Sequence, residues 1–88
     1  MAKLIKVDGT SETLNDLSLE SMQKAVGGYI ELVRSHQSEY DFICDEEGKL
    51  KGYPINAKAT HIAHEDKAPS LNDVLVGDVI VAKKGEIK

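Results

Sequence analysis

Hydrophobic residues between positions 19 and 26 recur with the period of an α-helix. They stand at positions i, i+3 and i+7 and therefore share one face: Leu19, Met22 and Val26. Ser18 can accept a hydrogen bond from the free N–H groups at the start of this helix. A Gly-Gly pair follows, and Gly27 falls where helix ends commonly adopt positive φ. The pattern predicts a helix over residues 19–26 that ends in a tight corner.

Four further segments have the apolar content or the alternation of β-strands. They cover residues 3–8, 29–34, 40–45 and 74–81. The second and third segments are close in sequence, which predicts an antiparallel hairpin. Side chains alternate along a strand, so Tyr40, Phe42 and Cys44 are expected on one face of the third segment. Gly77 and Asp78 interrupt the fourth segment and predict a bulge or tight turn there.

A second helix is predicted over residues 57–64, with Asn56 as its N-cap. The elements then follow the order β-α-β-β-α-β. Because 88 residues are few for helix layers on both sides of a sheet, we expect an α+β fold: a small, mainly antiparallel sheet with the helices packed on one face. Residues 1–88 are interpreted as a single domain, with residues 83–88 frayed at the C-terminus.

Composition and charge narrow the classes of function. The formal net charge is −4, and residues 29–47 hold six acidic residues against one arginine. This balance argues against direct binding of nucleic acid, which needs a basic face. No apolar run approaches the roughly 20 residues that span a membrane. The N-terminal residues lack the apolar stretch of a signal peptide, and Cys44 has no partner for an internal disulfide, so we expect a cytoplasmic protein.

Few residues have the spacing of a catalytic or metal site. His61 and His64 share a predicted helix face and could bind zinc together with Cys44 or His36, but the chain lacks the CxxC and HExxH patterns of zinc sites. Cys44 could act as a nucleophile with a histidine, yet it lies among apolar neighbours, where a cysteine usually behaves as a small buried residue. We therefore expect a protein that is not an enzyme, with no metal and no cofactor.

The aromatic residues are more informative. Three of the four lie in or beside the predicted hairpin: Tyr29, Tyr40 and Phe42. A tyrosine has a flat apolar face and a polar tip, so it can stack on a base or anchor a protein partner. The competing interpretation is that these side chains fill the small core.

Three stretches together resemble one protein family. "AVGGYIELV", "FICDEEGKLKGYPINAKAT" and "VGDVIVA" are similar, in order and spacing, to the phage and bacterial family known as domain of unknown function 3846. The resemblance covers about residues 19–82 and implies a small protein of phages, plasmids and their hosts. Such proteins often counter bacterial defence. The family pattern falls on Gly27, Gly28, Tyr29, Glu31, Glu47, Gly48, Pro54, Asn56, Ala59, Gly77 and Asp78.

Our leading hypothesis is a non-catalytic binding protein of phage or mobile-element origin that counters host defence. In its specific version, a homo-oligomer sequesters a small nucleotide immune signal in a pocket between subunits. Tyr29 would stack on the base, and backbone N–H groups of the glycines would meet phosphate. Six residues are expected to bind this ligand: Gly27, Gly28, Tyr29, Glu31, Asn56 and Thr60.

The alternative is a protein-protein inhibitor that uses an acidic hairpin, residues 39–47, against a nucleic-acid-binding host protein. Its partner-binding residues would be Asp41, Asp45, Glu46 and Glu47. A negative surface of this kind speeds association with a basic one. A third hypothesis, an enzyme that uses Cys44 or the histidines, requires an activity that disappears when those residues are replaced.

Overall fold

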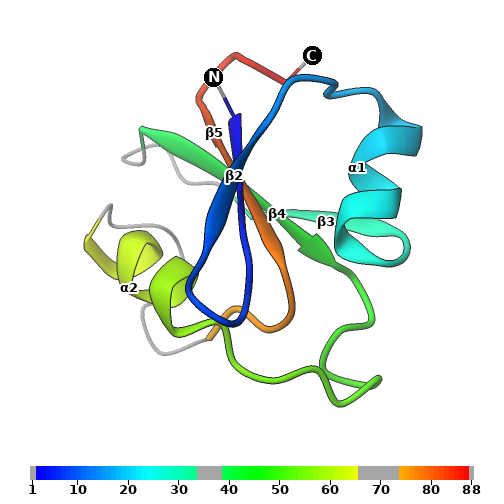
Figure 1. The fold of residues 1–88 in the computed structure, drawn as a ribbon, viewed down its shortest axis with the longest axis vertical. Coiled ribbons are helices and arrows are strands. Elements are labelled where there is room, and N and C mark those ends of the chain that lie inside the picture. The colour runs from blue at the N-terminus through cyan, green and yellow to red at the C-terminus, as the bar shows by residue number, and fades with distance from the viewer. Residues whose placement is uncertain (1, 34–38, 66–73, 88) are drawn as a thin grey trace.

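A computed structural model describes residues 2–33, 39–65 and 74–87 of the chain. The described elements follow one another in this order: β1 (Ala2–Ile5), β2 (Ser11–Leu14), α1 (Leu19–Val26), β3 (Ile30–Val33), β4 (Tyr40–Asp45), α2 (Ala57–Glu65) and β5 (Val79–Lys83). The strands form one five-stranded sheet in the order β2-β1-β5-β4-β3 (Figure 1). Every pair of neighbouring strands is antiparallel. The α+β class and the antiparallel sheet are therefore confirmed.

Strand β2 is an element that the hydrophobic pattern did not predict. The chain turns back after β1, where the Lys6 N–H donates to Thr10 O and Gly9 has a φ of 91°. Residues Ser11–Leu14 then pair with Ala2–Ile5 at the edge of the sheet. Only Leu14 in this strand is even partly buried. An edge strand that is so little buried needs no alternation of apolar and polar residues. The hydrophobic pattern therefore gave no sign of it.

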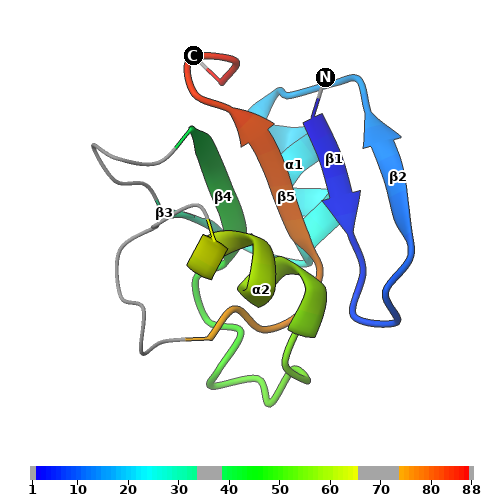
Figure 2. The same ribbon diagram turned by 90° about the vertical axis from the view of Figure 1, so that its left-hand side faces the viewer.

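The two helices lie on opposite faces of the sheet, so the prediction that both pack on one face is wrong (Figure 2). The reason lies in the three central strands, β1, β5 and β4, which carry apolar residues on both faces. In β4, for example, all residues from Asp41 to Asp45 are buried. A strand that is buried without alternation needs cover on both sides. The small sheet is therefore enclosed by one helix on each face.

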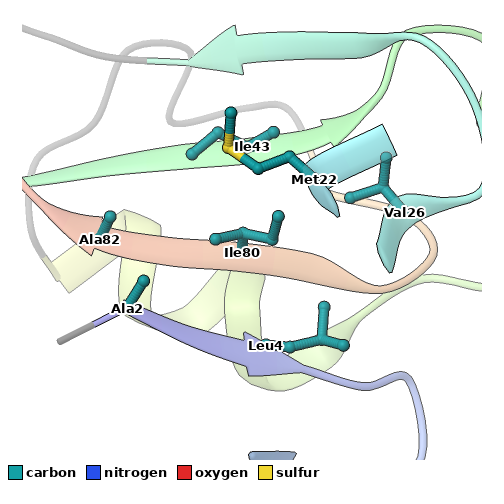
Figure 3. Packing of buried hydrophobic residues seen from close by; sticks show 7 residues of the cluster. All are labelled: Ala2, Leu4, Met22, Val26, Ile43, Ile80 and Ala82. Atoms are coloured by element: carbon teal, nitrogen blue, oxygen red, sulfur yellow. The ribbon is translucent and has the colours of Figure 1, made fainter. Parts of the chain in front are cut away.

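Each face has its own hydrophobic cluster. The cluster under α1 consists of small and aliphatic residues from the helix and the central strands (Figure 3): Ala2, Leu4, Met22, Val26, Ile43, Ile80 and Ala82. The cluster under α2 combines alternate positions of the same strands with two alanines of the helix: Ile5, Phe42, Cys44, Val79, Ala59 and Ala63. Tyr40 packs against this second cluster, so the predicted shared face of Tyr40, Phe42 and Cys44 is confirmed.

The predicted strand over residues 74–81 begins later than expected. Val76 makes only an isolated bridge with Ile55, and β5 starts at Val79 after a turn in which Gly77 has a φ of 73°. At the other end, residues 84–87, which we expected to fray, form a hydrogen-bonded turn. The Glu86 N–H donates to Lys83 O, and Ile87 packs against the cluster under α1.

Candidate functional site

The first helix ends in a corner built by two glycines. Helix α1 begins with the predicted N-cap, since the Ser21 N–H donates to Ser18 Oγ over 3.2 Å. At the other end Gly27 is left-handed, with a φ of 95°. The N–H groups of Gly27 and Gly28 both donate to Gln23 O, over 2.9 and 3.1 Å. This arrangement satisfies the Gln23 carbonyl near the end of the helix, and the chain then continues into β3.

A buried carboxylate supports this corner from below. Asp45 ends β4, and its side chain is only 1% exposed. Asp45 Oδ2 lies 2.7 Å from Lys51 Nζ, and its Oδ1 accepts the Glu47 N–H over 2.8 Å. Lys51 Nζ also donates to Gly27 O over 3.3 Å, which places a cation at the negative end of α1. The pair therefore ties the helix end to the turn of residues 46–52.

The contacts of this pair determine its protonation. Burial alone would raise the pKa of Asp45, but the hydrogen bonds from Lys51, the Glu47 N–H and Tyr53 outweigh it and hold the pKa below its ordinary value. The hydrogen bond to Asp45 raises the pKa of Lys51 above its ordinary value. Both groups are consequently charged at neutral pH, and their role in the described structure is to hold the corner.

The packing around Lys51 and Tyr53 leaves no room for a side chain at the two glycines of the corner or at Gly77. A Cβ on Gly28 would lie 2.7 Å from Lys51 Nζ, and one on Gly27 would lie 2.9 Å from Tyr53 Oη. On the other side of the Tyr53 ring, a Cβ on Gly77 would lie 2.6 Å from Cδ2. These close approaches explain why glycines occupy the two positions next to the Tyr53 side chain, Gly27 and Gly77.

Replacing Gly27 by alanine is expected to lower the free energy of unfolding by more than the roughly 1–2 kcal/mol that a left-handed alanine costs by itself, because the new Cβ also meets Tyr53. Urea unfolding measures the loss. Gly9→Ala is the matched control, since Gly9 has a φ of 91° and a Cβ added there would meet no other atom within 4 Å. Equal losses in the two variants would show that the Tyr53 contact is not tight.

Tyr29 stands on the outside of this corner with its side chain in solvent. The residue is 68% exposed, although its backbone is anchored by the hydrogen bond from the Glu46 N–H to Tyr29 O at 2.8 Å. Beside it lies a hollow of about 250 Å³, lined by Gln23, Gly28, Tyr29, Glu47 and Lys51. An exposed aromatic ring next to polar groups on a rigid corner is suited to binding rather than to folding.

Two of the six predicted ligand residues, Asn56 and Thr60, lie away from the corner, and their side chains form hydrogen bonds within the fold. Asn56 is fully buried: its Nδ2 donates to Ile5 O and Gly77 O, and its Oδ1 caps α2 by accepting the Ala59 N–H. Thr60 Oγ1 exchanges hydrogen bonds with the backbone of Leu75. The other four, Gly27, Gly28, Tyr29 and Glu31, lie at the corner or just after it.

The N–H groups that were expected to meet phosphate are also engaged, since Gly27 and Gly28 both donate to Gln23 O. The corner therefore offers a ligand the Tyr29 ring and side chains around it, rather than a nest of free backbone donors. The corner also lies at the C-terminus of α1. This end carries the negative end of the helix dipole and therefore disfavours a bound anion.

Of the four predicted partner-binding residues, two are buried and two are exposed. Asp41 is 0% exposed and Asp45 is 4% exposed, so neither can reach a partner from the described surface. Glu46 and Glu47 are exposed. Glu31, which we assigned to the ligand, is exposed as well and lines a hollow of about 170 Å³ together with Glu46. Three exposed glutamates therefore line the hollows beside the corner: Glu31, Glu46 and Glu47.

The sequence did not indicate the roles of Lys51 and Tyr53. Lys51 is six residues from Asp45, and only the course of the intervening turn brings the two charges together. Tyr53 gave a weak signal as the fourth aromatic residue, but its contacts with two distant glycines depend on the tertiary structure. Neither pairing has a local sequence signature.

The residues considered for catalysis are not grouped. Cys44 is buried under α2, and His61 Nε2 pairs with Glu65 Oε1 over 3.1 Å on the exposed side of that helix. His36 lies outside the described residues. In the ranges that the structure describes, no three His, Cys, Asp or Glu side chains are placed to hold a metal ion. No helix there is long and apolar enough to cross a membrane.

Fold and site together define a small α+β domain with an exposed tyrosine at a rigid glycine corner. The chain belongs to the family described as Domain of unknown function (DUF3846), whose model matches residues 2–87. The match confirms the family resemblance and extends it to β1 and β2. The comparisons with curated proteins and with solved structures found no match.

Proposed function

We propose that this protein is a non-catalytic binding protein that attaches to a basic surface of a host protein through Tyr29 and the glutamates around it. In its biological setting it would be a protein of phage or mobile-element origin that counters host defence. The observation that carries the proposal is the exposure of Tyr29 on a corner held by buried groups. A rigid aromatic side chain loses little entropy on binding and is a common anchor in protein interfaces.

The charges near Tyr29 support a basic protein as the partner. Glu47 shares the hollow beside Tyr29, while Glu31 and Glu46 share the neighbouring hollow with Lys49. Lys51 is already bound to Asp45 and to Gly27 O. Apart from Lys51, the charged residues that line the two hollows are three exposed glutamates, Lys49 and Asp45, so the charge lining them is negative. Such a surface steers a basic partner toward the anchor and repels an acidic one.

Sequestration of a nucleotide is the second candidate. The hollow of about 250 Å³ beside Tyr29 favours it, because a base could stack on the ring while Gln23 and Glu47 contact its polar edge. The local charge opposes it, because phosphate would approach glutamates and only one cation. Calorimetry with a panel of cyclic and linear nucleotides distinguishes the two, since only sequestration produces saturable heat.

Replacing Tyr29 by alanine is expected to abolish partner binding while changing the free energy of unfolding by less than about 0.5 kcal/mol, because the side chain is 68% exposed. A photo-crosslinking amino acid at position 29 or 46, expressed in host cells, should yield one common adduct. The matched control is position 13 on β2, at the opposite edge of the sheet, which should yield none.

The charge contribution is tested in the same cells. Reversal of Glu31, Glu46 and Glu47 to lysine should remove the adduct at position 29. The proposal is rejected if the adduct survives this reversal, or if position 13 gives the same species as position 29. Saturable nucleotide binding that is lost in Tyr29→Ala would instead favour sequestration.

A further inference from the structure

A third hollow lies on the face of the sheet that α2 covers only in part. Figure 2 shows α2 crossing one half of the sheet, while the ends of β4, β5 and β1 continue beyond it. There the structure contains a pocket of about 410 Å³. Six residues line this lysine-rimmed pocket: Lys3, Ile5, Tyr40, Ile62, Val81 and Lys83.

The floor and walls of the lysine-rimmed pocket are apolar. Ile5 is only 4% exposed and belongs to the cluster under α2, and Val81 and Ile62 pack against that cluster. The pocket is therefore a continuation of the hydrophobic core that remains open to solvent. Its volume is within the range of about 300–1,000 Å³ that small-molecule sites occupy.

Strand register places both lysines beside the same part of this floor. Lys3 pairs directly with Val81, and Lys83 follows Val81 by two residues on the same face of β5. Diagonal neighbours of this kind are about 7–8 Å apart, so two long side chains can converge on one group. Within residues 2–33, 39–65 and 74–87, neither ammonium group forms an ion pair.

Both lysines are exposed, and their long side chains can approach a common anion at the edge of the pocket. The whole chain is acidic, with a formal net charge of −4, so two neighbouring lysines beside one apolar pocket stand out from the average charge. An apolar cavity with two convergent cations at its edge matches one kind of molecule. Its body must be apolar and its head must carry a negative charge that can accept hydrogen bonds from ammonium groups.

We propose that the lysine-rimmed pocket binds a small amphipathic carboxylate, with its hydrocarbon body against Ile5, Ile62 and Val81 and its carboxylate between Lys3 and Lys83. This site is separate from the Tyr29 corner and does not depend on the function proposed for that corner. Binding requires no chemical step, because the cavity only removes the hydrocarbon from water and the lysines neutralise the head group.

Octanoate, used well below the concentration at which it forms micelles, is the probe, and 1-octanol is the uncharged reference. Titration calorimetry should show saturable octanoate binding. Amide and methyl NMR shifts should be confined to the residues that line the pocket. The double variant Lys3→Gln/Lys83→Gln should weaken octanoate binding by about tenfold or more and leave octanol binding unchanged, because only the charged head is affected.

The matched control is Lys24→Gln/Lys58→Gln, which removes the same charge from exposed lysines outside the pocket and should leave octanoate binding unchanged. Tyr29→Ala should also leave it unchanged, which separates this proposal from the function of the corner. The proposal is overturned if octanoate does not saturate, if the two double variants weaken binding equally, or if octanol binds as tightly as octanoate to the unmodified protein.

Discussion

Replacing Asn56 by alanine is expected to lower the free energy of unfolding by about 3 kcal/mol, the largest loss that we expect from any single polar side chain here. Asn56 is 0% exposed, and its amide joins three separate parts of the chain. Its Nδ2 lies 2.8 Å from Ile5 O at the end of β1 and 2.9 Å from Gly77 O before β5. Its Oδ1 lies 3.0 Å from the Ala59 N at the start of α2.

The size of this loss follows from what the alanine variant leaves behind. Two buried carbonyl groups and one helical N–H lose their hydrogen-bond partner at once, and water has little access to replace it. A buried polar group left without a partner costs about 1–3 kcal/mol, and the loss of an N-cap costs about 1 kcal/mol. Urea unfolding followed by circular dichroism measures the difference.

Ser18→Ala is the matched control for Asn56→Ala. Ser18 caps α1, but its hydroxyl accepts a single exposed hydrogen bond, from the Ser21 N–H. The expected loss is about 1 kcal/mol or less. Asn56→Asp provides a second comparison, because it keeps the acceptor for the Ala59 N–H and removes both donors. If Asn56→Ala cost no more than Ser18→Ala, Asn56 would be a cap and not a link between strands.

Replacing Asp45 by alanine is the second large effect that we expect, with a loss of about 2 kcal/mol at pH 7. The carboxylate is buried, and its removal takes away the acceptor of the Glu47 N–H and the partner of Lys51. The corner above it would lose its support, since Lys51 Nζ also holds Gly27 O. Thermal and urea unfolding at pH 7 measure the loss.

The same carboxylate makes stability depend on pH. The pKa of Asp45 is lower in the folded protein than its ordinary value of 3.8, so the unfolded chain binds its proton more readily. The stabilisation is therefore fully present above that ordinary value and is lost as the pH falls through the lowered folded pKa. Stability of the unmodified protein should decrease on acidification, and the decrease should be smaller in Asp45→Ala.

Two exposed aspartates complicate this measurement and also provide its control. Hydrogen bonds from Thr10 lower the pKa of Asp8, and those from Ser18 lower the pKa of Asp16. These two aspartates therefore also contribute to the decrease of stability on acidification in every variant that retains them. Asp16→Ala is the matched variant. Its stability should still decrease on acidification by most of the amount that is missing in Asp45→Ala. An unchanged decrease in Asp45→Ala would show that this carboxylate does not titrate as we infer.

Local signals in the sequence were sufficient for α1. The stripe of Leu19, Met22 and Val26, the Ser18 cap and the glycine at its end predicted the bounds that the structure has. The hairpin of β3 and β4 and the cap of α2 by Asn56 were also predicted within a residue or two. Each of these depends on residues within a few positions of one another, so a single stretch of chain contains the information.

The predictions that were wrong or incomplete concern contacts between distant segments. Strand β2 is stable because it pairs with β1, and its own residues are mostly polar and exposed. Both helices were predicted on one face, which is wrong, because alternate residues of β4, such as Phe42 and Ile43, are equally apolar. Either face could therefore attract a helix.

The candidate site also combines features that depend on neighbouring residues with features that depend on distant ones. The Gly-Gly corner follows from adjacent residues, and the sequence alone indicated it. The sequence left open whether Tyr29 packs in the core or binds a ligand, and only the structure shows its exposure. The sequence could not indicate that Asp41, Asp45 and Asn56 turn inward, because a polar residue is expected at the surface unless a partner compensates its burial.

For Asp45 and Asn56 the compensating partners are Lys51 and the backbone of Ile5, Gly77 and Ala59. Only the tertiary structure brings these groups within hydrogen-bond distance. The sequence by itself therefore determined the helices, the hairpin and the corner, since these depend on neighbouring residues. The packing of both sheet faces and the burial of the polar side chains were decided by the fold, because desolvation and its compensation depend on groups far apart in the chain.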